Sequence, residues 1–294
     1  MSFTGIDDIV SEMGAGKFYR LAFNRTIDTG ATSVAGRWHS CFTTGGTGGA
    51  MTVTGTAGTG IAFTRSTTGA LPLNANVSTD TRHLLSMYAT TPATTAVPAT
   101  LILTDIIHVY PSCALVTTPS TLSNHPTWTG TGDTRMTSAV GVQASILTTT
   151  ATTAGNGQIT LTYQDEAGNA GTSGSLYAPS TTTPTGCFWG AANAAVTLGA
   201  PFAALAAGDL GVRQVTSYTI NTGATSGVGA IILHRPIAEI PLAAANTPSE
   251  RSFLNDVLTL PRVYDDSCLA LIINVGGALT ASQTLTGTLN MAWG

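Results

Sequence analysis

The chain has 294 residues and a net charge of -4, and only 9% of its residues are Asp, Glu, Lys or Arg, against about 25% in an ordinary globular protein. Eleven basic residues spread over the whole length cannot form a nucleic-acid-binding face, which needs clustered Lys and Arg. A hydrophobic content of 43% excludes disorder of the highly charged type, and the composition is not that of a long coiled coil. We therefore expect a folded protein with no nucleic-acid partner.

The N-terminal segment predicts a short helix. Thr4 is placed to cap a turn from Ile6 to Met13, and Asp7 and Asp8 lie where the helix dipole favours acidic side chains. Residues 1–20 form either an arm that reaches a neighbouring molecule or a helix that caps its own domain. The segment lacks the pattern of a secretory signal, so we expect no export.

Apolar and polar residues alternate along most of the chain, with a period of two. Threonine occupies many of the polar positions, and its β-branched side chain suits a half-buried strand. Gly-rich connections separate the alternating segments. The pattern predicts an all-β fold of the β-sandwich or jelly-roll type. It is clearest in Met51–Thr54, Val140–Ile146, Ile159–Tyr163 and Leu285–Trp293.

Helices are expected to be few and short. Thr81–Tyr88, Pro201–Ala207 and Ser249–Asp256 each predict one or two helical turns. No segment has the long amphipathic period of a major helix, which argues against the shell fold of tailed-phage capsids. The apolar stretch Ala191–Ala207 is mostly alanine and is interrupted by Asn, Gly and Pro, so we expect no membrane-spanning helix.

Two pairs of segments resemble each other within the chain. Thr26–Ser33 is similar to Thr219–Ser226, and His108–Leu115 is similar to Arg262–Leu271. This similarity indicates either a duplication or chance in a chain rich in Thr, Gly and Ala. A duplication predicts an N-terminal β-rich unit with the short helix or arm (residues 1–125) and a C-terminal β-sandwich unit (residues 126–294). A single interleaved domain is the alternative.

The sequence contains no pattern of catalytic or metal-binding residues. Its five histidines are scattered, and it has no HExxH, GxSxG or Walker-type motif. His108 lies in an apolar run and is expected to be a buried core residue. The adjacent acids Asp165/Glu166 and Asp265/Asp266 are expected in turns, the first pair as a solvated hairpin tip. We predict no catalytic residue, no cofactor, no metal and no enzymatic activity.

The cysteines form no CxxC pair, and we expect them to be reduced and buried, with disulfides as the alternative. They are Cys41, Cys113, Cys187 and Cys268.

The scarcity of charge predicts a surface that other molecules cover. Exposed surfaces normally carry charge for solubility and to protect strand edges, whereas neutral hydroxyl-rich faces cost little to desolvate when hydrogen bonds are exchanged. Tryptophans such as Trp128 are candidates for interface anchors, with a core position as the alternative. The composition therefore favours a structural subunit of an assembly.

Three segments carry a resemblance to virion structural proteins of tailed bacteriophages. They are Ile159–Gly171, Gly208–Ile220 and Gly229–Leu242, within residues 138–242. These segments resemble capsid decoration, or cement, proteins. The resemblance implies a β-sandwich or jelly-roll unit that binds the outer surface of a capsid, made in the host cytoplasm and often a symmetric oligomer. It implies no catalytic residues.

This resemblance predicts the major capsid protein and copies of the chain itself, as a dimer or trimer, as partners, with no nucleic acid and no membrane. Arg213, Arg235 and Glu239 would orient the contacts, with Trp128 as a further interface residue. An ion pair between Arg213 and Asp209 within their own loop is the alternative for Arg213. A tail-fibre or receptor-binding protein of the same particle is the alternative function.

Overall fold

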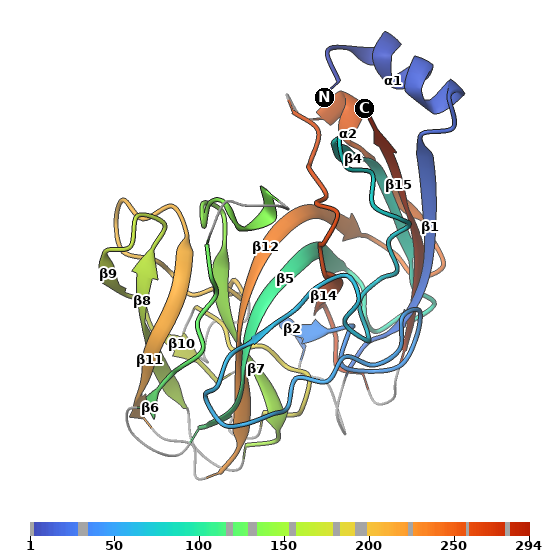
Figure 1. Ribbon diagram of the computed structural model, residues 1–294. Helices are drawn as coiled ribbons and strands as arrows, with labels where there is room; N and C mark the ends of the chain where they lie inside the picture. The colour runs from blue at the N-terminus through green and yellow to red at the C-terminus, as the bar shows by residue number, and fades with distance from the viewer. Residues whose placement is uncertain are drawn as a thin grey trace.

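The computed structural model describes residues 3–28, 35–115, 120–128, 134–152, 157–178, 183–191, 199–222, 226–256, 259–279 and 283–294. Within these residues, the chain forms three sheets whose strands pair antiparallel (Figure 1). The helices are short, as the sequence predicts: α1 (Ile6–Gly14), a 3-10 turn η1 (Thr134–Met136) and α2 (Phe253–Asp256). The predicted all-β, sandwich-like fold is confirmed.

The central sheet is built on two long strands, β5 (Ala99–Ala114) and β12 (Val228–Leu242), which pair with each other over most of their length. Both strands bend strongly (Figure 1). The order of strands is β2-β14-β5-β12-β7, with β3 paired to β5. The other strands are β2 (Arg37–Ser40), β3 (Ile61–Ala62), β7 (Gln143–Thr150) and β14 (Leu269–Val275).

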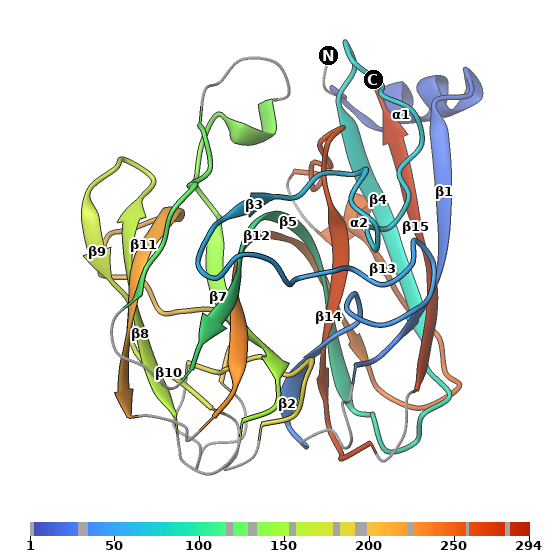
Figure 2. The ribbon, with the colours of Figure 1, turned by 60° about the horizontal axis from the view of Figure 1, so that its bottom comes forward.

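The terminal sheet brings the two ends of the chain together. Its order is β1-β15-β4-β13, and α1 packs against it (Figure 2). Its strands are β1 (Phe18–Thr26), β4 (Arg82–Thr90), β13 (Ser249–Ser252) and β15 (Thr284–Trp293).

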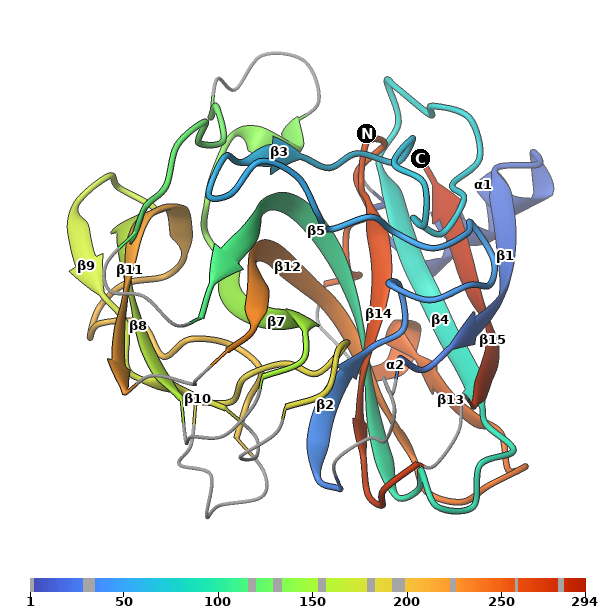
Figure 3. The ribbon, with the colours of Figure 1, turned by 90° about the horizontal axis from the view of Figure 1, so that it is seen from below.

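The distal sheet lies on the other side of the central sheet (Figure 3). Its order is β10-β8-β11-β6, with β9 paired to β8. Its strands are β6 (Ser120–Thr121), β8 (Gln158–Asp165), β9 (Ala170–Thr172), β10 (Leu176–Tyr177) and β11 (Val212–Thr222).

The long strands of the central sheet take part in two sandwich cores. Leu101 and Leu103 of β5 pack in a core with residues of the terminal sheet, whereas Ile107 and Tyr110 pack in a second core with residues of the distal sheet. A third hydrophobic cluster includes Ile102 of β5, and loop residues such as Phe42, Met51 and Val53 cover it. Since β5 is covered on both faces, it is buried at nearly every position.

A buried ion pair lies on β5 between the two sandwich cores. Asp105 and Arg135 are both almost fully buried, and the Arg135 Nε donates to the Asp105 Oδ2 at 3.0 Å. Ser267 Oγ and the Cys268 N–H donate to the same carboxylate. The remaining guanidinium N–H groups donate to the carbonyls of Phe63, Ile106 and Asp266. Burial raises the pKa of Asp105, and the Arg135 guanidinium opposes this shift.

A second buried arginine holds the long loops that follow β2. Arg25 of β1 donates to the carbonyl oxygens of Cys41, Thr47, Gly49 and Gly69 at 2.6–3.1 Å. These loops contain few strand residues, so side-chain donors satisfy carbonyls that no ladder satisfies. Four of the eleven basic residues are buried: Arg25, Arg37, Arg82 and Arg135.

Most predicted strands are present. Ile159–Tyr163 lies in β8 and Leu285–Trp293 lies in β15, where Leu285, Leu289 and Met291 enter the core as their spacing predicts. Val140–Ile146 is a strand only from Gln143. Met51–Thr54 is not a strand, although Met51 and Val53 are buried alternately, because loop residues rather than a ladder surround it.

Three helix predictions need correction. Thr81–Tyr88 lies in strand β4, which is held by β15 on one side and β13 on the other. Ser249–Asp256 is half strand (β13) and half helix (α2). Pro201–Ala207 is not helical, since its Ala203 and Ala206 N–H groups donate to neighbouring segments and not within a helix.

Two details of the turns also differ from the predictions. The N-cap of α1 is Gly5, not Thr4; Thr4 donates to the Asp8 carboxylate instead. Asp165 does lie at the β8–β9 turn, but it is buried rather than solvated because its carboxylate accepts hydrogen bonds from Ala167 and Asn169.

Strands from both halves of the chain pair with each other. β1 pairs with β15, and β5 pairs with β12, so hydrogen-bonded ladders cross the expected boundary at residues 125/126. The proposed duplication stays a prediction, and parts of Thr26–Ser33 and Thr219–Ser226 lie outside the described residues.

We expect the substitution Arg135→Met to lower the free energy of unfolding by about 3–5 kcal/mol, because it leaves the Asp105 carboxylate buried without its cation. Urea unfolding of both proteins measures the difference. Arg251→Met is the matched control, since it removes an exposed ion pair with Asp256 and should cost at most about 1 kcal/mol. Equal losses in the two variants would contradict the role given to Arg135.

Candidate functional site

Two exposed apolar side chains mark a candidate interaction surface. Val140 is 49% exposed and Leu210 is 60% exposed. They lie on adjacent loops, joined by a 2.9 Å hydrogen bond from the Gly141 N–H to the Leu210 carbonyl. We call Val140, Leu210, the neighbouring Arg213 and Arg235, and the hollow beside them the 140/210 surface.

Hydrogen bonds hold the two loops in place. The Val212 N–H donates to the Val142 carbonyl, and the Leu210 N–H donates to Glu166 Oε2 at 2.9 Å. The loops approach so closely that a Cβ at Gly211 would lie 1.9 Å from the Ala139 carbonyl oxygen. Glycine is therefore required at position 211, and the exposed side chains are presented by a fixed backbone.

Arg235, which the sequence predicts as a contact residue, lies at the edge of this surface. Its guanidinium donates to the Ser138 carbonyl at 2.8 Å and lies 5.4 Å from the ring centroid of Tyr264. The Arg262 guanidinium lies 4.3 Å from the same ring. Tyrosine and arginine are enriched among the residues that dominate binding at protein interfaces.

The structure also brings Arg213 and Trp128 together here. The Trp128 indole N–H donates to the Arg213 carbonyl at 2.7 Å, and the half-buried ring packs against the second core. The alternative partner of Arg213, Asp209, instead accepts a hydrogen bond from the Tyr163 hydroxyl. Arg213 forms no ion pair with any residue that the structure describes.

Glu239 lies apart from the other predicted contact residues. It is exposed on β12, four residues beyond Arg235, and its carbonyl accepts a hydrogen bond from Arg251 at 3.0 Å. It borders a separate apolar hollow with Phe202, Pro236 and Phe253.

An open hollow of about 590 Å³ is lined in part by Asp209 and Pro236, the chain neighbours of Leu210 and Arg235. Apart from Gln143 and Asp209, its lining is apolar: Ala191, Ala200, Phe202, Ala203, Ala204, Leu205, Ala206 and Pro236. The described residues of its lining offer no histidine, thiol or hydroxyl group, so its chemistry suits an apolar side chain rather than a reacting substrate.

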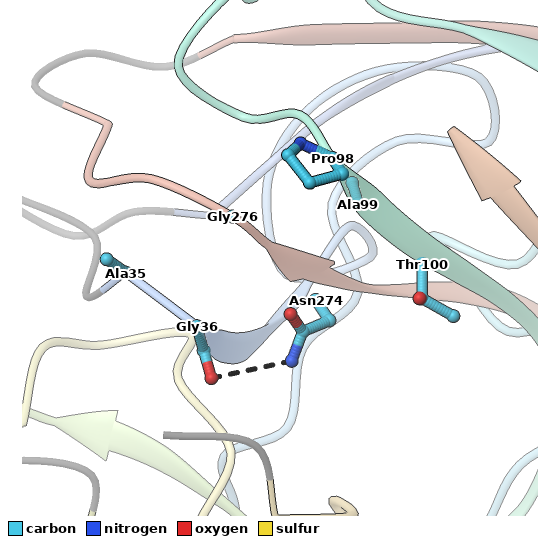
Figure 4. A pocket seen from close by; sticks show the side chains of 7 residues that line it. All are labelled: Ala35, Gly36, Pro98, Ala99, Thr100, Asn274 and Gly276. Carbon is cyan, nitrogen blue, oxygen red and sulfur yellow. Dashed lines mark hydrogen bonds between the residues drawn. The ribbon is translucent and has the colours of Figure 1, made fainter. Parts of the chain in front are cut away.

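A second hollow lies at the edge of the central sheet (Figure 4). It has a volume of about 470 Å³ and is lined by residues with no charged, histidine or cysteine side chain. The Asn274 amide donates to the Gly36 carbonyl at 3.5 Å and is thereby engaged. Among the described residues, this lining contains no acidic or basic side chain.

The titratable groups of the interior are enclosed in the cores. His234 is buried between the hydroxyls of Thr104 and Ser145, with both ring nitrogens hydrogen-bonded. His108 is buried as predicted, and its Nε2 donates to the Asn124 carbonyl. Burial lowers the pKa of His108 to about 4 and that of His234 to about 3.

Among the described residues, no three His, Cys, Asp or Glu side chains are grouped so that they could hold a metal ion. Within the same residues, no helix is both long and apolar enough to cross a membrane. All four cysteines are free and buried, as predicted.

The sequence did not single out Val140, Leu210 or Tyr264 as surface residues. The alternation around Val140 predicts a strand position, whereas the structure places Val140 in the turn before β7. The one available signal is that Gly208 and Gly211 flank Leu210, a pattern typical of a turn.

No protein family and no curated protein matches the chain. The crystal structure of the infectious bursal disease virus VP2 subviral particle aligns over 94% of this chain and 80% of that chain, with 7% identity and a TM-score of 0.19. The structure of the infectious bursal disease virus Gx strain aligns over the same shares, with 10% identity and a TM-score of 0.20. The similarity to these viral structures is weak, and TM-scores of this size do not show a common topology.

We expect the protein to lose stability as the pH falls from about 6.5 toward 4. The unfolded chain protonates His108 and His234 at the ordinary histidine pKa of 6.5, whereas the folded protein resists protonation to about pH 4 and pH 3. Each histidine lowers the free energy of unfolding by up to about 1.4 kcal/mol per pH unit within this range. Urea unfolding at pH 7 and pH 5 measures the difference.

Substitution separates the contributions to this pH dependence. His234→Asn should reduce the change between pH 7 and pH 5 by about half, if the two buried histidines contribute equally. His125→Asn, at a partly exposed position, is the control and should change it less. A change between pH 7 and pH 5 that is the same in the wild type and in His234→Asn would contradict a neutral buried His234.

We expect none of the four thiols to react with a thiol reagent at pH 8 in the folded protein, because all are buried. Burial also raises the pKa of Cys41 and Cys113 to about 12, so little thiolate is present. Labelling followed by mass spectrometry should find four modifications only after unfolding. A Leu210→Cys variant, with an exposed thiol, is the control for reagent activity.

Proposed function

We propose that the chain is a structural subunit of a virus particle, and specifically a decoration or cement protein on the outer capsid surface of a tailed bacteriophage. It would act without catalysis, bind the major capsid protein and copies of itself, and be made in the host cytoplasm. The observation that carries the proposal is the distribution of charge: the chain has few charges, and it buries four of its eleven basic residues.

The outer face of the terminal sheet supports this function because it carries neutral, hydrogen-bonding side chains. On β15, the half-buried Thr286, Thr288 and Asn290 alternate with the core residues, so they contribute hydroxyl and amide groups to the outer face of the terminal sheet. Such groups exchange hydrogen bonds with a partner at lower cost than Lys or Glu. A surface of this kind is suited to being covered.

The construction of the fold supports a mechanical role. Two strands of the central sheet, β5 and β12, contribute to both cores, and buried arginines hold the loops. A rigid subunit that binds at many symmetry-related points strengthens a shell through many modest contacts. The 140/210 surface, with its exposed apolar side chains and two arginines, is one such contact.

We expect purified particles to contain the protein in hundreds of copies located on the head. Quantitative mass spectrometry gives the copy number, and a gold-labelled antibody in electron microscopy gives the position. Capsids that lack the protein should gain heat resistance when it is added. A few copies confined to the tail would favour the fibre alternative and exclude decoration.

The absence of catalysis is tested separately. Incubation with host polysaccharide should release no reducing ends above the level of a heat-unfolded sample. Cleavage by the folded protein would overturn the non-enzymatic part of the proposal.

A further inference from the structure

The most exposed large hydrophobic side chains of the described residues form two pairs. Ile6 and Val10 of α1 are each 64% exposed, and Leu210 and Val140 are 60% and 49% exposed. Exposed apolar side chains that are grouped in this way mark interaction sites more often than isolated ones do.

The first pair belongs to a helix with an unpartnered apolar face. Ile6, Val10 and Met13 are spaced by four and three residues, so they share one side of α1. Only Ile9 of this helix is buried, in a small cluster with Leu85 and Ala292.

Acidic residues flank the apolar face of α1. The helix carries Asp7, Asp8 and Glu12 and no basic residue. Asp8 accepts hydrogen bonds from Thr4, and Glu12 pairs with Lys17 at 2.9 Å. Asp7 is exposed next to Ile6 and has no ion pair with a described residue.

The second pair lies on the 140/210 surface, which is flanked by basic residues. Arg213 lies three residues after Leu210, and Arg235 donates to Ser138, two residues before Val140. The nearby acids are already engaged: Asp209 by the Tyr163 hydroxyl and Glu166 by the Leu210 N–H. The 140/210 surface therefore complements α1 in two ways: its apolar side chains match the apolar face of the helix, and its arginines match the aspartates of the helix.

The two pairs lie at opposite ends of the molecule. In Figures 1, 2 and 3, α1 lies at the terminal sheet, whereas β11, which begins two residues after Leu210, lies beyond the central sheet. The α1 helix of a chain therefore does not reach the 140/210 surface of the same chain. A contact between them must join two copies.

We propose that α1 of one copy docks on the 140/210 surface of a second copy, with Ile6 and Val10 against Leu210, Val140 and the adjacent hollow, and Asp7 near Arg213. A nine-residue helix is about 14 Å long, and the hollow of about 590 Å³ leaves room for its side chains. The contact joins two different surfaces, so it is heterologous. Repetition gives a closed ring or an open chain.

This inference rests on the proposed role as an assembly subunit, and it is tested on the isolated protein so that each can fail without the other. Light scattering after size exclusion at about 0.1 mM should show oligomers of the wild-type chain. Val10→Ser and Leu210→Ser should each weaken association at least about tenfold. Ile61→Ser, at an exposed hydrophobic position elsewhere, is the matched control and should leave it unchanged.

Charge reversal and cross-linking test the pairing itself. Asp7→Arg should weaken association, and combination with Arg213→Asp should restore it. Val10→Cys mixed with Leu210→Cys should form disulfide-linked dimers on mild oxidation, since the native thiols are buried, whereas Val10→Cys mixed with Ile61→Cys should not.

Three results would overturn the proposal: a monomeric wild-type chain at about 0.1 mM, association that survives Val10→Ser or Leu210→Ser, or equal cross-linking in both mixtures. If the chain is a monomer that still binds capsids, the decoration role holds and the self-contact is wrong. If it forms a ring that binds no capsid, the self-contact holds and the decoration role is wrong.

Discussion

The buried pair of Asp105 and Arg135 is the interaction on which the central sheet depends, and the other two sheets pack against that sheet. Asp105 lies on β5 between the residues that enter the two sandwich cores, a position where a carboxylate requires full compensation. Arg135 supplies the charge, and it also donates to the carbonyls of Phe63, Ile106 and Asp266. One side chain thereby joins η1, β5, the segment after β3 and the segment before β14. These hydrogen bonds hold the bent sheet at the point where its two cores separate.

The same chemistry explains why the chain has ten arginines but only one lysine. A guanidinium presents five donors in a fixed plane and can satisfy several carbonyls at once, whereas an ammonium is a compact, strongly hydrated charge. Arg25 uses this capacity to hold four loop carbonyls inside the protein. Much of the positive charge therefore serves the interior, and the surface is even poorer in charge than the composition indicates.

How much of this could be predicted from the sequence depends on whether the signal is local. Alternation is local, so β8 and β15 were predictable with their core faces. Thr81–Tyr88 was not, because its strand conformation is imposed by β13 and β15, which lie far away in the chain. In the candidate site, Arg213 and Trp128 were predicted and are in contact, and the predicted Arg235 holds the loop that leads to Val140. Leu210 and Val140 could not be recognised as a surface, since only the packing of two loops around Gly211 exposes them together.

The long strands of the central sheet lie between the two exposed apolar pairs, so they would transmit force from one pair to the other. In the proposed head-to-tail contact, a load between neighbouring copies enters at α1 on the terminal sheet and leaves at the loops before β7 and β11. Between these points lie β5 and β12, which are 16 and 15 residues long and paired with each other. A load on these strands is shared by many ladder hydrogen bonds at once, whereas a linker between separate domains would yield by bending. An interleaved chain whose central sheet belongs to both cores is thus better suited to resist expansion of a shell than two sandwiches joined in series.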